Sequence, residues 1–181
     1  MGQDVRQDWA IPLPVMHALM ERLEEEWGMG GNLEDRALIA SIGAYAIIAF
    51  CGSFRGSEVF LTDLCGLRKY LWEPLSPEAP PHVVIPLLGQ FKGEQNTRYH
   101  LTPLAAETKS GLKVRTWVTR LVEVRVQEGR IQGPAFCNAQ GGIARSRDYK
   151  FALKERLQSI QVNQVGLIPG DVDILEDFGV S

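Results

Sequence analysis

The sequence is poor in the residues that build metal centres, disulfide frameworks and membrane anchors. It holds three scattered histidines and three cysteines (Cys51, Cys65 and Cys137) without Cys-x-x-Cys spacing. An odd number of cysteines among apolar residues predicts reduced thiols in an intracellular compartment, cytoplasmic or nuclear. We therefore expect no metal ion and no small-molecule cofactor. The longest apolar run, residues 37–51, is interrupted by small and polar residues, which argues against a membrane span.

The formal net charge of the chain is only -3, but the charge is segregated along it. Residues 1–35 carry eight acids and two bases, whereas residues 111–154 carry nine bases and three acids. Segregation of this kind can give an acidic protein one basic face for an anionic partner. Ordinary solvated helix faces would produce the same pattern, so charge alone leaves both interpretations open.

Apolar periodicity predicts helices in the first third of the chain. Apolar residues recur at every fourth position from Val15 to Trp27, the pattern of an amphipathic helix. A second helix, at about 33–52, is apolar nearly all round and should be the central, buried one. A third, shorter helix is expected from Ser57 to Leu64.

Extended segments follow. Residues 65–72 are expected to form a short strand, and residues 82–88 and 97–104 two further strands joined by a polar hairpin loop. Two more helices, at about 112–129 and 145–161, complete the pattern. The last of them should turn three apolar side chains inward: Phe151, Leu153 and Leu157. We predict an α+β fold, mainly helical, with a small three-stranded antiparallel sheet.

The most informative stretch lies where the long apolar helix ends, and it reads Gly52-Ser-Phe-Arg-Gly-Ser-Glu-Val-Phe-Leu-Thr-Asp-Leu64. It places Arg55 and Glu58 three residues apart, a spacing that brings two side chains to one face of a helix. An arginine at a buried helix junction, with its own carboxylate, suits anion binding. A buried ion pair that fixes the junction would use the same two residues, so both interpretations stay open.

This stretch resembles the first arginine box of the tyrosine recombinases and phage-type integrases. In that family a three-stranded sheet follows the box, and a turn of the sheet carries a catalytic lysine. Here Lys92 lies in the predicted hairpin loop, and the next strand ends in Leu101-Thr-Pro-Leu104, which matches the family's hairpin. The later pair of helices, with Phe136 in the loop between them, also matches. The resemblance covers roughly residues 33–160 and implies an integrase-like catalytic core.

The resemblance implies binding to the phosphate backbone of double-stranded DNA, with self-association on the DNA as a further option. Arg55 would stabilise charge on phosphate oxygens, because its guanidinium is fork-shaped and always protonated. Glu58 would hold Arg55 in place, and Lys92 would protonate the leaving 5′ oxygen during strand breakage. The bases of the helices at 112–129 and 145–161 would position the DNA backbone. The candidate DNA-binding residues are Arg98, Arg145, Arg147, Lys150 and Lys154.

Two parts of the family's site have no counterpart in the sequence. The second arginine box and the nucleophilic tyrosine would follow the last helix, yet no His, Arg or Tyr occurs after Val162. Tyr149 precedes that place and is interpreted as structural. The chain is therefore expected to be inactive by itself. It divides into a leader with a first helix that could be the remnant of another domain (1–31), a partial recombinase-like catalytic domain (32–161) and an acidic tail (162–181).

Two other hypotheses stay open beside the recombinase-like one. The same scaffold could serve as a non-catalytic DNA-binding module, or as a protein-interaction domain without a nucleic-acid partner. A solvated loop lysine at position 92 would be compatible with both of them.

Overall fold

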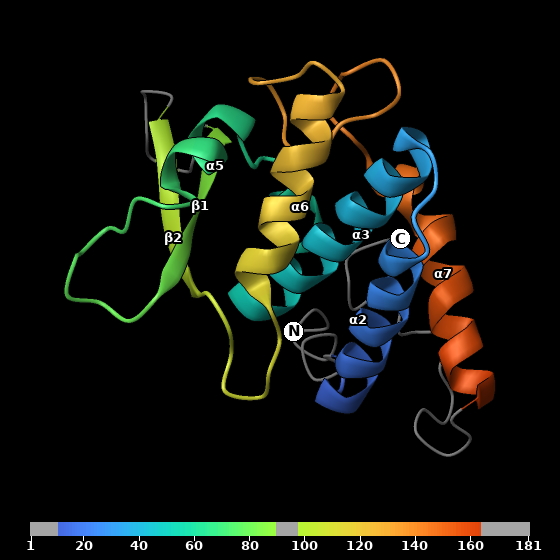
Figure 1. Ribbon diagram of the computed structural model, residues 1–181. Helices are drawn as coiled ribbons and strands as arrows, with labels where there is room; N and C mark the ends of the chain where they lie inside the picture. The colour runs from blue at the N-terminus through green and yellow to red at the C-terminus, as the bar shows by residue number, and fades with distance from the viewer. Residues whose placement is uncertain (1–10, 90–97, 164–181) are drawn as a thin grey trace, which may run out of the picture.

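A computed structural model describes residues 11–89 and 98–163 of the chain. Figure 1 shows long helices gathered on one side of the molecule and a β-hairpin on the other, with α6 between them. The longer helices are α2 (Leu13–Gly28), α3 (Leu33–Gly52), α6 (Val114–Gln127) and α7 (Ser146–Asn163). The remaining elements are α4 (Gly56–Val59), α5 (Leu64–Tyr70), β1 (His82–Gly89) and β2 (Arg98–Ala105). The chain is α+β and mainly helical, as predicted.

The predicted central helix is confirmed as α3. Its start is capped by Asn32, whose side chain accepts a hydrogen bond of 2.8 Å from the backbone N–H of Asp35. All residues from Ile39 to Ala49 are buried. By length and composition α3 could also cross a membrane. Of its most apolar stretch of 18 residues, 67% is buried inside the protein. The buried core helix of a globular protein shares these properties.

Gly43 allows α3 and α6 to approach each other closely. A Cβ atom at Gly43 would collide with the indole ring of Trp117, a buried residue of α6. The apolar stripe predicted for α6 is buried, and it consists of Val114, Trp117, Leu121 and Val124. The packing of α3 against α6 is the most extensive contact between helices in the described part of the chain.

The first helix, α2, belongs to the same core as the later helices. Its buried side chains pack in one cluster with residues of α3, α6 and α7. Figure 1 shows α2 and α7 side by side. The Arg156 guanidinium of α7 donates two hydrogen bonds, of 2.7 and 2.8 Å, to the Glu26 carboxylate of α2. Buried residues on both sides of position 31 therefore pack in one core.

The prediction of a third strand at residues 65–72 is wrong, because these residues lie mainly in α5. The apolar residues Leu64, Leu67 and Leu71 are three and four positions apart, which is a helical period, and all three are buried. The Asp63 side chain caps α5 by accepting a hydrogen bond of 3.0 Å from the Gly66 N–H. The sheet of the described residues therefore has two antiparallel strands, with His82 opposite Ala105 and Gly89 opposite Arg98.

The predicted helix from Ser57 to Leu64 is shorter in the structure and ends at Val59. The chain then runs along the free edge of β1. The Leu88 N–H donates to the Leu61 carbonyl at 2.8 Å, and the Asp63 N–H donates to the Pro86 carbonyl at 3.0 Å. This segment forms an isolated bridge between Thr62 and Leu87, so β1 has backbone partners on both sides.

The predicted inward orientation of α7 is correct for Leu153 and Leu157, which are buried, but wrong for Phe151. The Phe151 side chain is 72% exposed. The start of α7 is anchored by another aromatic residue, Tyr149. Tyr149 packs with Tyr45, Phe60 and Phe136, and the ring centroids of these four residues lie 5.1–6.5 Å apart. Because Tyr149 is the inward residue of the first turn, Phe151, two positions later, points away from the core.

The contact between Gly43 and Trp117 predicts a large effect of one added methyl group. Gly43→Ala should lower the free energy of unfolding by about 1–3 kcal/mol, because Trp117 must shift in a packed core. The measurement is urea denaturation followed by circular dichroism.

Gly28→Ala is the matched control, since a Cβ at Gly28 meets no atom within 4 Å. It should leave stability unchanged or raise it by up to about 1 kcal/mol. Equal losses of stability in the two variants would contradict this account of the packing of α3 against α6.

Candidate nucleic-acid interface

The end of α3 forms a tight turn that brings Arg55 to the surface. Ser53 has a left-handed backbone with φ of 53°, and the ring of Phe54 lies where a Cβ atom on Gly52 would be. Arg55 follows as the N-cap residue of α4. The sequence suggested a buried helix junction at this point, but Arg55 is exposed.

Glu58 holds the backbone of Arg55 and not its guanidinium. The Glu58 carboxylate accepts a hydrogen bond of 2.7 Å from the Arg55 backbone N–H, and the Arg55 carbonyl accepts one of 2.9 Å from the Glu58 N–H. Reciprocal bonds of this kind cap the start of a helix. Within residues 11–89 and 98–163, the Arg55 guanidinium forms no ion pair. The buried ion pair between Arg55 and Glu58 that the sequence left open is therefore not present.

The start of α7 repeats this arrangement. The Asp148 carboxylate accepts a hydrogen bond of 2.7 Å from the Arg145 backbone N–H, and the Arg145 carbonyl accepts one of 2.9 Å from the Asp148 N–H. Arg145 is exposed. The carboxylate nearest to each of the two arginines, Arg55 and Arg145, is thus used to cap a helix.

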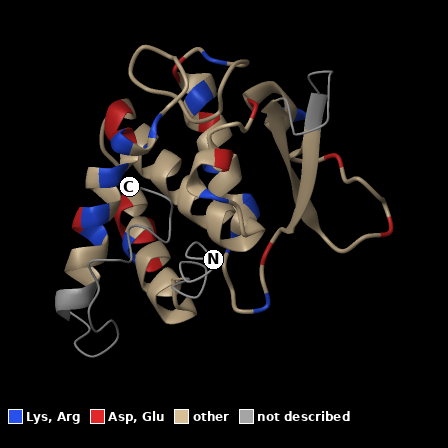
Figure 2. Ribbon diagram, turned by 180° about the vertical axis from the view of Figure 1, so that it is seen from behind, with Lys and Arg blue, Asp and Glu red and all other residues tan. Residues whose placement is uncertain are grey.

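The predicted bases of α7 gather near its first turns. Arg147 and Lys154 are exposed and Lys150 is half-buried. We call these three residues and Arg145 the α7 basic face. None of the four forms an ion pair with a described residue. Figure 2 shows that charged residues of both signs lie mainly on the helices, while the strands are nearly free of them.

Three arginines of α6 make contacts within the molecule, and only one of them, Arg125, is buried and so unable to hold a DNA phosphate as expected. Arg125 is 2% exposed. Its guanidinium donates hydrogen bonds to the Ala135 carbonyl at 2.8 Å, to the Glu128 carboxylate at 2.9 Å and to the Ser41 hydroxyl at 2.6 Å. Its position on the helix gives the reason, because Arg125 lies four residues after the buried Leu121 and seven after the buried Val118, on the face that meets α3.

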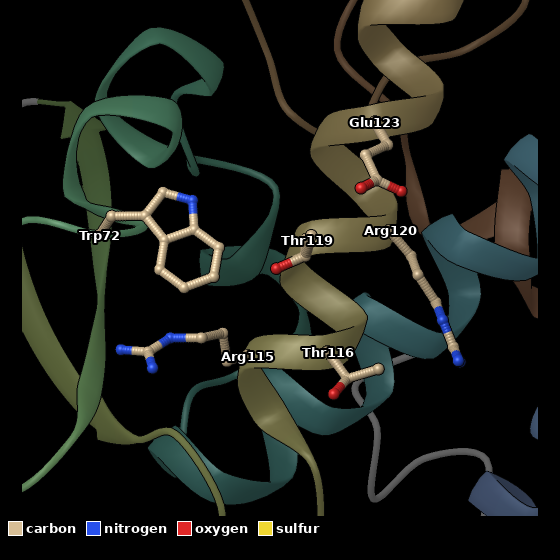
Figure 3. A pocket seen from close by; sticks show the side chains of 6 residues that line it. All are labelled: Trp72, Arg115, Thr116, Thr119, Arg120 and Glu123. Carbon is tan, nitrogen blue, oxygen red and sulfur yellow. The ribbon is translucent and has the colours of Figure 1, made fainter.

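Two other bases of α6 lie beside a shallow groove, shown in Figure 3. Arg115 lies under the indole ring of Trp72, 5.0 Å from its centroid, and donates a hydrogen bond of 2.9 Å to the His82 carbonyl. Arg120 points away from Trp72 and pairs with Glu24 of α2. The groove has a volume of about 350 Å³ and is also lined by Thr116, Thr119 and Glu123. With Arg115 and Glu123 the groove carries side chains of both charges.

Lys92, the predicted general acid, lies outside the described residues. Arg98 is the first residue of β2, where its Cα lies opposite that of Gly89 at the loop end of the hairpin. The strands on either side of the loop agree with the predicted hairpin. No hydrogen bond or ion pair links Arg55 to the α7 basic face within the described part of the chain.

Tyr149 is buried, in agreement with its interpretation as a structural residue, and its exposed fraction is 4%. Burial raises the pKa of Tyr149 to about 12, although the nearby Arg125 guanidinium and Ser41 hydroxyl oppose this shift. Burial also raises the pKa of Tyr45 above its ordinary value, with a smaller contribution from Tyr149. A neutral, enclosed phenol cannot reach a phosphate in DNA without unfolding of the first turn of α7.

Two features of this region were not predicted. Arg125 lies four residues after Leu121 and seven after Val118, on the buried stripe of α6, although its charge predicts an exposed side chain. The exposure of Phe151 was also not predicted. Helical spacing indicates it, because Tyr149, Leu153, Leu157 and Ile160 define a buried stripe that excludes position 151.

Compared with protein-family models, with curated proteins and with solved structures, the chain matches none of them. The resemblance to tyrosine recombinases therefore rests on the residues of the arginine box, the hairpin and the order of the elements. Among the described residues there is no group of three or more His, Cys, Asp or Glu side chains that could hold a metal ion.

The burial of Tyr149 predicts a specific pH dependence of stability. Its pKa is about 12 when folded and about 10 when unfolded, so only the unfolded state loses the proton as the pH rises past 10. Stability is therefore retained below pH 10 and lost above it. Between pH 9 and pH 11 the free energy of unfolding of the parent chain should fall. In Tyr149→Phe this fall should be smaller by about 1 kcal/mol.

The measurement is urea denaturation at several alkaline pH values. Parallel losses of stability in Tyr149→Phe and in the parent chain would show that the phenol of Tyr149 is not enclosed.

Proposed function

We propose that this chain binds the phosphate backbone of duplex DNA and is an integrase-like protein of the tyrosine recombinase type. The observation that carries the proposal is the α7 basic face, four cations without an ion-pair partner among the described residues. Most other arginines of the helices contact carboxylates, carbonyls or aromatic rings of the same molecule. Free cations in one place are what a polyanion needs, because binding then breaks no internal pair.

Physical chemistry gives this face a sequence-independent role. Each cation that contacts a phosphate releases a condensed counterion, and the entropy of that release drives binding. Four such contacts predict a slope of log K against log salt of about -3 to -4. Side chains that contact only the backbone fix the position of the duplex and carry no sequence information.

Arg55 would supply a further phosphate contact of a different kind. Its guanidinium is unpaired within the described residues, and the reciprocal cap with Glu58 fixes its Cα. In the recombinases that the sequence resembles, the corresponding arginine stabilises the charge that builds on phosphate oxygens during strand breakage. Lys92 would act as the general acid of the same step. Strand breakage is the activity of the complete family, and this chain is proposed to contribute the first arginine and the hairpin lysine.

A non-catalytic DNA-binding module on the same scaffold is the second candidate. The burial of Tyr149 favours it, because the tyrosine nearest to the α7 basic face is unable to act as a nucleophile. This candidate needs the basic face but no contact between Arg55 and DNA.

Both candidates place the protein where DNA is found, in the cytoplasm or nucleus of a cell. The unpaired thiols of Cys51, Cys65 and Cys137 are compatible with this location.

Removal of the four cations tests the proposal. A variant in which Arg145, Arg147, Lys150 and Lys154 are all replaced by Gln should bind a 20-base-pair duplex at least about tenfold more weakly at 50 mM salt. It should also lose most of the salt dependence, about one unit of slope for each contact removed. The measurement is fluorescence anisotropy of a labelled duplex over a range of salt concentrations.

A charge-matched control distinguishes a local face from general electrostatics. Four other exposed bases, Arg68, Lys69, Lys109 and Lys113, lie on α5 and near the start of α6. Replacing all four by Gln changes the net charge equally and should leave most of the affinity and the slope intact. Equal losses in the two variants, or no measurable binding by the parent chain at 50 mM salt, would contradict the proposal.

A further inference from the structure

The exposed side of α7 combines cations with one large apolar side chain. Arg147, Phe151 and Lys154 are four and three positions apart, so they share a face of the helix. Phe151 is 72% exposed, and Lys150 lies beside it on the preceding position. The exposed Glu155 is the acid nearest to Phe151 on the later turn. An apolar side chain among free cations fits a segment that carries both acids and apolar residues.

The chain itself contains such a segment directly after α7. Residues 164–181 carry four acids (Asp171, Asp173, Glu176 and Asp177) and no Lys, Arg or His. Apolar residues alternate with the acids, and they include Ile174, Leu175 and Phe178. The acids of this segment are therefore complementary to the bases on the exposed side of α7, and its apolar residues to Phe151.

The lengths of the two segments also match. The 16 steps along the helix from Arg147 to Asn163 correspond to about 24 Å at a rise of 1.5 Å per residue. Asp171 follows Asn163 by eight steps, which an extended chain covers in about 26 Å. Gly166 and the Pro169-Gly170 pair supply residues that favour a reversal of the chain. The acids can thus reach every base of the α7 basic face.

We propose that residues 164–181 bind the exposed side of α7, over Phe151 and the α7 basic face, and compete there with DNA. The competition rests on the proposed function, whereas the intramolecular contact does not. A short tether gives the segment an effective concentration on the order of millimolar, so a weak contact is enough to populate the bound form. When the segment is bound, the affinity of the protein for DNA would be lower. Only partners that bind the α7 basic face strongly enough to displace the acidic segment would then be bound.

The contact can be measured without DNA by lysine acetylation and mass spectrometry. Two full-length proteins are compared at low salt, the parent chain and a variant with Asp171→Asn, Asp173→Asn, Glu176→Gln and Asp177→Asn. Lys154 should react several-fold more slowly in the parent chain than in the variant. The difference should vanish near 1 M salt, where the Debye length is about 3 Å. The exposed Lys109 is the internal reference, and its rate should be the same in both proteins. Equal rates at Lys154 in the two proteins would overturn the proposal.

The competition is tested with the same proteins and a labelled duplex at 50 mM salt. The tail variant should bind on the order of tenfold more tightly than the parent chain. A control with four exposed acids replaced by Gln has the same net charge as the tail variant, and these acids are Glu73, Glu78, Glu107 and Glu123. An equal gain in the control would overturn the competition. Protection of Lys154 together with no DNA binding by any variant would leave the intramolecular contact standing and overturn the proposed function.

Discussion

The buried guanidinium of Arg125 is the interaction on which the arrangement of the helices depends. It links α6 to Ser41 of α3 and to the Ala135 carbonyl, in the loop that leads to α7. The Ser41 hydroxyl also donates a hydrogen bond of 2.6 Å to the Ala37 carbonyl, so the network continues along α3. Removing one partner of a buried charge costs about 3–5 kcal/mol, because the remaining polar groups lose their hydrogen bonds inside the core. The position of α7 therefore depends on a cation that never meets solvent.

This network divides the bases of the second half of the chain into two groups. Those of α6 turn toward the core, toward Trp72 or toward α2, and their charge is used within the molecule. Among the described residues, none of those at the start of α7 pairs with a carboxylate, and Asp148 caps the helix. A chain with a net charge of -3 can in this way present a locally positive surface. In the same way, Glu58 binds the backbone of Arg55, and the Arg55 guanidinium has no ion-pair partner among the described residues.

Much of the fold follows from the sequence, because apolar periodicity is strong in α2, α3 and α6 and the hairpin is marked by its polar loop. The third strand was mispredicted because residues 65–72 carry too few turns for a helical period to stand out, and the cap at Asp63 was not recognised. The candidate site was harder to predict. Spacing places Arg55 and Glu58 together, but only the backbone geometry shows that the carboxylate binds an N–H and not the guanidinium. Helical spacing places Arg125 on the buried stripe of α6, but its hydrogen-bond partner Ser41 is 84 residues away in the sequence and could not be predicted.

The central claim is that the α7 basic face and Arg55 hold one DNA duplex. Hydrogen exchange measured by mass spectrometry, with and without a 20-base-pair duplex at 50 mM salt, tests both parts at once. If both parts hold the duplex, exchange in residues 145–154 and 53–58 should be slower when DNA is bound, with no change around Trp72. Protection of residues 145–154 alone would support the non-catalytic module. Protection confined to other elements, or no protection at a duplex concentration that saturates binding, would contradict the account.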